Sequence, residues 1–372
     1  MRRLVVQRHL RRPGTGGCAL TIGNFDGVHR GHQAMLALLV NEARHRSLPS
    51  CVLTFEPHPR DFFARRAGRP ETAPARIGTL RDKLAELALC GIDHVVVMRF
   101  DERLAAMSPQ AFVDQVLVRG LSARYVLVGD DFSYGARRAG NYATLDAAGA
   151  ASGSASGGAS GGGSRGASGG ASGGAPNSGG FDVARMMSYE VHGLRVSSSA
   201  VREALAAGDM ARAAALLGRP YAISGRAVHG RKLGRTLGFR TLNLRFPHPR
   251  PAASGIFVAQ VHGLEGPEGS STAPVPAVVS LGVRPTVEDA GRVLLEAHCL
   301  HWPATLGDEG GYGRLLRVEL LHKLHGELKY EGLDALREGI ARDTQAARDW
   351  FGGAAGTDRA GFSVGIPAGG HD

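Results

Sequence analysis

The pattern of hydrophobic and polar positions changes its period repeatedly along the first part of the chain. Short apolar runs, typical of buried strands, are followed by longer segments in which apolar residues recur every three or four positions. Strands are predicted at residues 18–23, 50–57, 94–100 and 124–129, with helices between them at residues 32–46, 81–91 and 108–120. Strands that alternate with helices are typical of a parallel sheet with helices on both faces, so an α/β domain is predicted here.

The pattern beyond position 220 is different. Turns separate short apolar runs, without a clear helical period between them, at residues 255–261, 277–283 and 316–321. Closely spaced strands of this kind predict an antiparallel barrel or sandwich, which a helix at residues 332–351 closes. Between the two parts, residues 196–220 have the pattern of a serine-capped pair of helices that ends near Gly218.

A Gly/Ser/Ala tract interrupts the chain at residues 151–180, where only Arg165, Pro176 and Asn177 are of another type. Such a tract cannot bury enough apolar area to offset the entropy cost of ordering it, so a disordered insertion is predicted. Taken alone, the tract either links two domains or forms a loop within one domain.

Composition adds limits on size, partners and compartment. The length of 372 residues predicts two domains. The net charge of +10 suits nucleic acid, an anionic membrane or a small phosphorylated ligand, but no dense basic tract with interleaved aromatic residues favours nucleic acid. No segment approaches the roughly 20 apolar residues that cross a bilayer. Four widely separated cysteines form no CxxC pair, so a reduced, cytoplasmic protein is expected.

Candidate chemistry lies directly after the first predicted strand, in the sequence GNFDGVHRGH. Gly23 permits a close approach of a ligand to the backbone, and Asn24 and Asp26 can cap the following turn. The next helix is predicted to begin near His32. His29 and His32 are three residues apart and share one face, so both can point at the helix N-terminus, where amides and the helix dipole favour a phosphate.

This pair of histidines has two other possible explanations. An HxxH spacing also arises by chance, and it occurs in metal sites. The pair follows directly after a strand and a glycine-rich turn, and this specific context argues against a chance occurrence. No third His, Cys or carboxylate lies at a usual ligand spacing, which argues against a metal site. Imidazoles placed there can donate hydrogen bonds to oxygens that gain charge when a phosphorus is attacked.

The whole chain resembles one family, the bacterial bifunctional riboflavin kinase/FAD synthetases, whose first half carries the nucleotidyltransferase HxGH motif. After GNFDGVHRGH, the resemblance continues in family order through LTFEPHP, VGDDFSYG, VSSSAVR, GRAVHGRKLGRTLGFRTLNL, SLGVRPT, LLEAHCL and YGRLLRVELLHKLHGELKY. It implies an N-terminal Rossmann-like nucleotidyltransferase domain and a C-terminal antiparallel β-barrel riboflavin kinase domain. VSSSAVR belongs to the first half in the family but follows the Gly/Ser/Ala tract here, so the tract is predicted to interrupt the first domain.

These considerations set the predicted boundaries. The adenylyltransferase domain is assigned residues 1–205, with the insertion at about 149–180. A helical connector follows at residues 206–220, then the kinase domain at 221–351 and a flexible tail at 352–372.

The resemblance implies adenylyl transfer in the first domain, in which FMN attacks the α-phosphorus of ATP with the help of Mg²⁺ and pyrophosphate leaves. His29 and His32 would contact the ATP phosphates, and Arg202 would neutralise their β and γ charges. The residues expected to form the rest of the ATP cradle are Gly23, Asn24, Asp26, Ser198 and Ser199. Those expected to bind the flavin are Pro57, Pro59, Phe62 and Asp131.

The resemblance implies phosphorylation of riboflavin by ATP in the second domain. Glu296 would take the proton from the riboflavin 5′-hydroxyl, and Thr241 and Asn243 would hold Mg²⁺ and ATP phosphate. A glycine-rich ATP loop is expected at Gly230, Gly234 and Gly238. The family has Pro-Thr-x-Asn where this chain reads RTLN, so Arg240 replaces a proline in the nucleotide loop.

The leading hypothesis is therefore a two-site enzyme that acts on riboflavin, FMN and ATP, with neither nucleic acid nor a membrane as partner. One alternative is an FMN adenylyltransferase whose kinase-like domain is impaired by Arg240. A non-catalytic flavin- or nucleotide-binding protein is a second alternative, but binding alone does not require paired imidazoles. A cytidylyltransferase or pantetheine-phosphate relative would share HxGH without explaining the C-terminal motifs. The sequence does not predict the oligomeric state.

Overall fold

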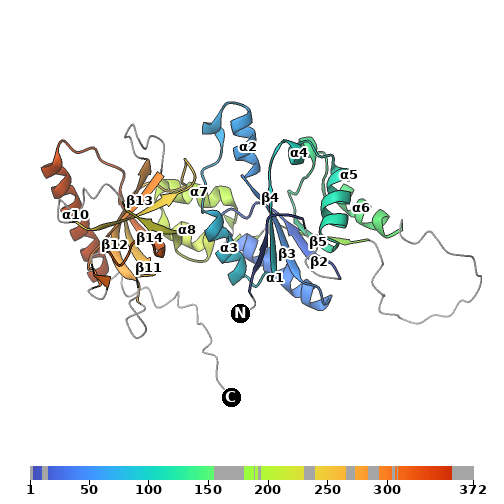
Figure 1. The fold of residues 1–372 in the computed structure, drawn as a ribbon, viewed down its shortest axis with the longest axis horizontal. Coiled ribbons are helices and arrows are strands. Elements are labelled where there is room, and N and C mark those ends of the chain that lie inside the picture. Colours follow the sequence, from blue (N-terminus) through green and yellow to red (C-terminus); the bar gives the residue numbers. More distant parts are fainter. Residues whose placement is uncertain are drawn as a thin grey trace, which may run out of the picture. The chain divides into compact units, whose positions relative to one another are not determined.

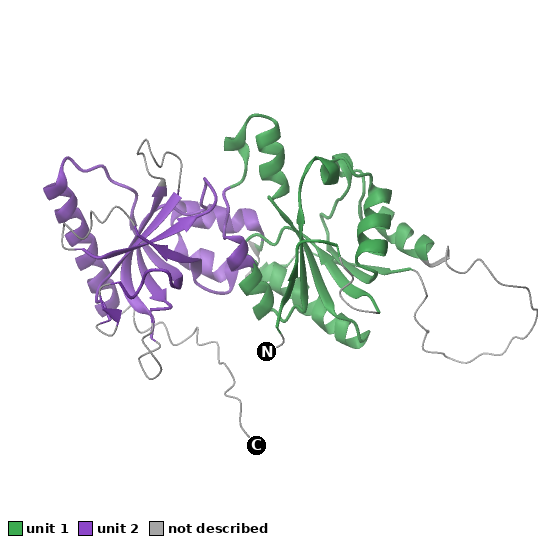
Figure 2. Ribbon diagram, viewed as in Figure 1, with its two compact units in different colours: residues 1–74, 84–196 green, residues 75–83, 197–372 purple. Residues whose placement is uncertain are grey.

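The computed structural model describes residues 3–10, 16–154, 180–187, 189–191, 194–229, 239–264, 273–283, 293–303, 306–307 and 309–353. It divides the chain into two compact units (Figure 2). Unit 1 comprises residues 1–74 and 84–196, and unit 2 comprises residues 75–83 and 197–372. Most of the Gly/Ser/Ala tract and nearly all of the predicted tail lie outside the described residues.

Unit 1 is built on a six-stranded sheet with the order β1-β4-β3-β2-β5-β6, and every pair of neighbours is parallel (Figure 1). The strands are β1 (Val5–Gln7), β2 (Cys18–Ile22), β3 (Ser50–Glu56), β4 (His94–Arg99), β5 (Ala123–Gly129) and β6 (Asp182–Met186). The central strand β2 is buried along its whole length, which explains its continuous apolar sequence. The predicted parallel α/β sheet is confirmed.

The helices of unit 1 lie between these strands in the chain. They are α1 (Arg30–His45), α2 (Pro59–Arg66), α4 (Glu102–Ala105), α5 (Pro109–Phe112) and α6 (Tyr142–Ser154), with a π-helical stretch, η2 (Val113–Gly120), that continues α5. Helix α3 (Leu80–Leu89) begins in the segment assigned to unit 2 and continues in unit 1. Helix α6 reaches Ser154, so the first residues of the Gly/Ser/Ala tract are helical. The chain returns as β6, which pairs with β5 in the same sheet. The segments on both sides of the tract therefore belong to unit 1.

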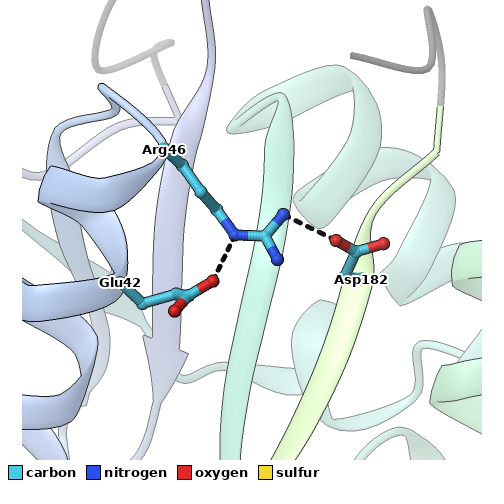
Figure 3. A network of polar contacts seen from close by, with 3 residues as sticks. All are labelled: Glu42, Arg46 and Asp182. Atoms are coloured by element: carbon cyan, nitrogen blue, oxygen red, sulfur yellow. Dashed lines mark hydrogen bonds and ion pairs between the residues drawn. The ribbon is translucent and has the colours of Figure 1, made fainter. Parts of the chain in front are cut away.

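Strand β6 is fastened to α1 by a network of charged groups (Figure 3). Arg46, the residue that ends α1, donates from Nε to Oε1 of Glu42 over 2.5 Å and from Nη1 to Oδ2 of Asp182 over 2.6 Å. Its guanidinium carbon lies 4.7 Å from the centre of the Tyr125 ring on β5. The first residue of β6 is thus linked to α1 and β5 directly after the tract.

Unit 2 is a closed antiparallel barrel with the strand order β10-β13-β12-β11-β14-β9. Its strands are β9 (Tyr221–Val228), β10 (Thr241–Phe246), β11 (Gly255–His262), β12 (Val275–Val283), β13 (Val293–Cys299) and β14 (Leu315–His325). Of the two predicted architectures, barrel or sandwich, the barrel is the one formed. The predicted C-terminal helix is α10 (Leu333–Gly352), whose Ala347 packs on Val258 and Val278 of the barrel.

The predicted pair of helices precedes the barrel as α7 (Ser198–Ala207) and α8 (Met210–Leu217). The Ser197 hydroxyl caps α7 by accepting from the amide of Ala200, and Gly218 ends α8 in the left-handed conformation. A short sheet of β7 (Glu190–Val191) and β8 (Leu194–Arg195) lies before them in unit 1. Within the described part of the chain, no helix is both long and apolar enough to span a membrane.

One segment of the first half of the sequence, residues 75–83, packs in unit 2. The carbonyl of Ala75 accepts a hydrogen bond from Nε of Arg202 over 2.7 Å. The Asp82 carboxylate accepts from the amide of Ser224 on β9 over 3.0 Å. The sequence does not predict that residues 75–83 pack in unit 2, because their pattern of apolar positions does not distinguish one unit from the other.

Candidate functional site

The order of the strands in unit 1 reverses direction between β2 and β5. From β2 the chain proceeds to β3 and β4 on one side, and β5 then lies on the other side of β2. In open α/β sheets, ligands bind beyond the carboxyl ends of strands at such a reversal. Strand β2 ends at the glycine-rich turn of the HxGH motif, and β5 ends at Gly129.

Two contacts bring the turns after β2 and β5 close to the same helix. A Cβ on Gly129 would lie 3.5 Å from Oδ1 of Asp131 and 3.6 Å from the terminal methyl of Met35 on α1. Met35 also accepts a hydrogen bond at sulfur from Thr21 of β2. The GDDFSYG motif therefore lies beside α1, the helix that begins in the HxGH motif.

The turn after β2 holds its backbone in a conformation that L-residues rarely adopt. Phe25 has a φ of 47°, Gly27 of 84° and Val28 of 41°. Positive φ is costly for a bulky or β-branched residue and persists only where the surroundings enforce it. Phe25 and Val28 are both buried to within 1% of full burial, so their side chains anchor the turn.

The two histidines are stacked at the start of α1. Their ring centroids are 3.6 Å apart and the planes are inclined by only 15°. Nδ1 of His29 accepts a hydrogen bond from the backbone amide of His32 over 3.3 Å, which makes His29 the N-cap of α1. The helix consequently begins at Arg30, two residues before the predicted start at His32. Because Nδ1 accepts this bond, the neutral His29 ring carries its proton on Nε2.

The other side of His32 is covered by Phe25, whose ring centroid lies 5.0 Å from that of His32. His32 is therefore held between an imidazole and a phenyl ring, and the strained turn that positions Phe25 also orients His32. Side chains fixed in this way are preorganised to donate hydrogen bonds at the helix N-terminus.

Gly31, between the two histidines, allows a close approach of the VSSSAVR motif. A Cβ at this position would lie 3.4 Å from the carbonyl oxygen of Val196 and 3.3 Å from Nδ1 of His29. Val196 leads directly into Ser197, the cap of α7. The glycine of the HxGH motif thus makes room for the chain that enters α7.

Asn24 and Asp26 lie in the strained turn. Asp26 is 3% exposed, and the backbone carbonyl of Asn24 accepts from the Thr54 hydroxyl over 3.3 Å. The amide oxygen of the Asn24 side chain is buried and accepts no hydrogen bond from any described residue. A buried acceptor without a protein donor is what a site for a donor on a ligand requires.

An aromatic cluster follows β3. Pro59 is the first residue of α2, and the preceding Glu56–Pro57 peptide is cis. The rings of Phe62 and Phe63 on α2 lie 5.3 Å apart, and each packs edge-on against Phe100, which follows β4. Phe63 is 48% exposed, so the cluster presents an aromatic surface to solvent.

The predicted phosphate-binding Arg202 lies on α7 in unit 2, where its Nε donates to the carbonyl of Ala75. Ser198 and Ser199 are the first two residues of the same helix, so their amides are among those that α7 leaves without an intrahelical partner.

In unit 2 a group of polar side chains shares the outer face of the barrel. Thr241 lies opposite His298, and Asn243 lies opposite Glu296, in the ladder between β10 and β13. Residues that face each other across a ladder point to the same side of the sheet. The alternate residues of the two strands are fully buried and fill the barrel interior: Leu242, Leu244, Leu295 and Ala297.

The environment of this group constrains its chemistry. Asn243 is 2% exposed, and Glu296 also lies opposite Ser280 of β12. Burial lowers the pKa of His298, against the effect of its bond to the carbonyl of Arg240, so the ring is neutral at pH 7. Nδ1 of His298 is 2.9 Å from that carbonyl oxygen and donates to it. The glycine-rich loop residues Gly230, Gly234 and Gly238 lie outside the described residues.

Comparison with known proteins shows which family the two halves of the chain match. Residues 12–157 match the family model of FAD synthetase, and residues 217–351 match that of riboflavin kinase. Three relatives, each named bifunctional riboflavin kinase/FMN adenylyltransferase, match almost end to end. The protein of Escherichia coli K12 is 41% identical over 90% of this chain and 93% of its own length. Those of Pseudomonas fluorescens and Haemophilus influenzae are 40% and 36% identical, over 93% and 90% of this chain and 96% and 94% of theirs.

The chain belongs to the bifunctional riboflavin kinase/FMN adenylyltransferase family. The fold is also that of a solved structure titled macrolide-efflux protein from Streptococcus pneumoniae, with a TM-score of 0.66 over 93% of this chain and 99% of that one. At 22% sequence identity this likeness concerns the fold alone.

Within this family framework, sequence reasoning missed His298. It lies two residues after Glu296 in LLEAHCL, and a strand's period of two places both on one face. That period was available in the sequence. The role of Tyr312, whose hydroxyl donates to the carbonyl of Thr241 over 3.2 Å, had no such signal because 71 residues separate them.

Proposed function

We propose that this chain phosphorylates riboflavin to FMN with ATP and then adenylylates FMN to FAD with a second ATP, releasing pyrophosphate. The observation that supports it best is the presence of two preorganised sets of side chains in one family member. The first is the stacked pair of His29 and His32 at the N-terminus of α1. The second is the polar group around Asn243 and Glu296 on the barrel.

In the adenylylation step, a phosphate oxygen of FMN attacks the α-phosphorus of ATP and the bond to pyrophosphate breaks. No protein group forms a covalent bond, so the protein contributes alignment and charge stabilisation. The Nε2–H of His29 and the ring of His32 provide donors beside the amides of α1. We assign Gly23, Asn24, Asp26, Ser198 and Ser199 to ATP binding, and Arg202 to the charge of the β- and γ-phosphates.

For the flavin in this step we assign the aromatic surface of α2. Phe62 and the exposed Phe63 offer flat apolar area, and Pro57 and Pro59 restrict the chain that carries them. Asp131, beside α1, is available to accept a hydrogen bond from the flavin.

In the phosphorylation step, Glu296 accepts the proton of the riboflavin 5′-hydroxyl while that oxygen attacks the γ-phosphorus, and ADP leaves. The register supports this assignment, because Glu296 lies between Asn243 on one neighbouring strand and Ser280 on the other. We assign Thr241 and Asn243, two residues apart on the same face, to contacts with the phosphates.

A magnesium ion fits the donor set of both Thr241 and Asn243. Mg²⁺ prefers oxygen ligands and keeps substrate phosphates among them, and a hydroxyl and an amide oxygen meet that preference. We propose that the ion arrives with ATP, whose phosphates supply further oxygen ligands. When bound, it neutralises charge on the transferred phosphoryl group.

We also propose that these reactions take place in the cytoplasm. All four cysteines are free, and three of them are buried. Free, widely separated cysteines are typical of a reducing compartment.

Incubation of the purified protein with riboflavin, ATP and Mg²⁺, followed by chromatography, tests the proposal. FMN is expected first and FAD second, and FMN supplied directly should give FAD. FAD from FMN but not from riboflavin would favour the alternative of an adenylyltransferase with an impaired kinase site. Formation of neither flavin would reject both activities.

A further inference from the structure

The residue that replaces the family proline, Arg240, is held by its side chain. Its guanidinium carbon lies 4.6 Å from the centre of the Trp302 ring, which is the geometry of a cation–π contact. Nη1 of Arg240 donates to the carbonyl of Gly307 over 3.4 Å, and the same carbonyl accepts from Nε1 of Trp302 over 2.8 Å. The carbonyl oxygen of Gly307 thus accepts hydrogen bonds from both Arg240 and Trp302.

The indole of Trp302 is itself fixed in place. A Cβ on Gly311 would come within 2.9 Å of Cη2 of Trp302 and within 2.9 Å of Cδ2 of Leu242. Gly311 therefore leaves the space that the indole fills, and Leu242 borders the same space. Leu242 is the second residue of β10, so Trp302 packs beside the start of this strand. Arg240 is the residue directly before the strand.

The backbone carbonyls of Arg240 and Thr241 also accept hydrogen bonds from side chains of other segments. The carbonyl of Arg240 accepts from Nδ1 of His298, and the carbonyl of Thr241 accepts from the Tyr312 hydroxyl. These two hydrogen bonds hold the peptide units at the start of β10. The contacts of the Arg240 side chain hold the residue directly before the strand.

We propose that Arg240 and Trp302 form a clamp that positions Thr241 and Asn243 for the kinase reaction. The clamp replaces the restriction of φ that a proline gives at this point in the family motif. Arg240 and Trp302 are positioning residues, since they act through the backbone at the start of β10. The proposal rests on the kinase activity proposed above, and it explains how the nucleotide loop accommodates arginine.

Loss of the clamp should weaken ATP binding in the kinase step more than it slows turnover. Asn243 faces Glu296 across the ladder, and a small displacement at residue 240 changes how Thr241 and Asn243 meet the phosphates. A cation–π contact of ordinary strength corresponds to a change of about 3- to 30-fold in an equilibrium constant.

The test uses Trp302→Leu, which retains apolar packing against Gly311 but removes the π face. Kinase kinetics are measured with riboflavin and varied ATP, and adenylylation with FMN serves as the control on the same preparation. The KM for ATP of the kinase step is expected to rise by about 3- to 30-fold, with kcat changed less and adenylylation unchanged. An unchanged KM would overturn the clamp.

The variant Arg240→Pro, which restores the proline of the family motif, tests whether Trp302 positions the start of β10 or only packs in the fold. In an Arg240→Pro background, φ is fixed by the ring, so Trp302→Leu should have no further effect on the KM for ATP. An equal effect in both backgrounds would show that Trp302 only supports the fold, and thermal unfolding of each variant reports any loss of structure separately.

The contact can also be followed without turnover. The chain has two tryptophans, so Trp350→Phe leaves Trp302 as the only indole, and adding Arg240→Ala should shift its fluorescence emission. Unchanged emission would contradict the stack. If Arg240→Ala causes this shift but the wild-type protein has no kinase activity, the stack exists and the proposed function is refuted, and with it the catalytic purpose of the clamp.

Discussion

His29 and His32 lie face to face with their ring centroids 3.6 Å apart, and the backbone amide of the second donates to the ring of the first. Each ring is therefore part of the other's support. The pair belongs to the turn after β2, where positive φ angles at Phe25 and Val28 are enforced by burial. The strained turn and the capped helix thus hold both rings at the N-terminus of α1.

The first prediction concerns His32. His32→Ala removes a donor and the stacking partner of His29, so adenylylation of FMN should fall by about 10²–10³-fold while phosphorylation of riboflavin is unchanged. Steady-state rates with each flavin substrate measure both effects.

His45→Ala is the matched control, because His45 lies exposed in the last turn of the same helix. The double variant His29→Ala/His32→Ala should lose less than the product of the two single losses, because the rings act as a unit. Independent, multiplicative losses would argue against the stacked pair as a working unit.

The second prediction concerns the barrel. Glu296→Gln keeps the size of the side chain but removes the base, so phosphorylation should fall by about 10²–10⁴-fold and adenylylation should remain. The same two assays give the answer. Glu331→Gln, an exposed carboxylate before α10, should leave both rates as they are. Equal damage to both steps by Glu296→Gln would mean that the steps do not use separate sites.

The third prediction is a dependence of stability on pH. Nε2 of His325, at the end of β14, lies 2.8 Å from Oδ1 of Asp343 on α10. Partial burial lowers the pKa of His325, but the bonds to Asp343 and to the carbonyl of Gly326 outweigh it, so the pKa is raised above 6.5. The pair therefore stabilises the fold fully below about pH 6.5 and loses this contribution as the pH rises through the folded-state pKa.

Melting temperatures of the wild type and His325→Gln across this range test the sign. The difference between the two proteins should be largest at acidic pH and shrink toward alkaline pH, and Asp343→Asn should abolish the dependence. A difference that grows with pH would contradict the raised pKa.

The fourth prediction concerns the charged network at β6. Arg46→Gln removes the link between Glu42 and Asp182, and because these groups are partly exposed the loss should be only about 0.5–1.5 kcal/mol in the free energy of unfolding. Hydrogen exchange should accelerate locally in β6. Arg44→Gln, an exposed neighbour on the same helix, is the control, and equal effects of both variants would show that the network contributes nothing specific.

The sequence was sufficient for the elements with a strong period. Strands β2 and β3 are mostly apolar because both faces of a parallel sheet are covered, and this signal is local. Strand β1 has three residues with two exposed valines, and β6 follows a low-complexity tract, so neither had a comparable pattern. Both lie at the edges of the sheet, where pairing rather than apolar period defines a strand.

The site residues also fall into those that a local sequence pattern predicts and those that it does not. Gly23, His29 and His32 stand in one short motif, and a helix period of 3.6 was enough to predict that the two rings share a face. The capping role of His29 was missed because it depends on a side-chain rotamer. The packing of residues 75–83 in unit 2 and the stack of Arg240 on Trp302 join residues far apart in the chain, and one sequence contains no information on such pairs.

One chain carries out two different transfers from ATP, and the two transfers leave different phosphorus products. Transfer of the γ-phosphoryl group leaves ADP, whereas transfer of the adenylyl group leaves pyrophosphate. Phosphorus NMR of a reaction started from riboflavin should show one ADP for each FMN or FAD formed and one pyrophosphate for each FAD, and a reaction started from FMN should show pyrophosphate alone. Riboflavin turned over without ADP, or FMN without pyrophosphate, would contradict the account.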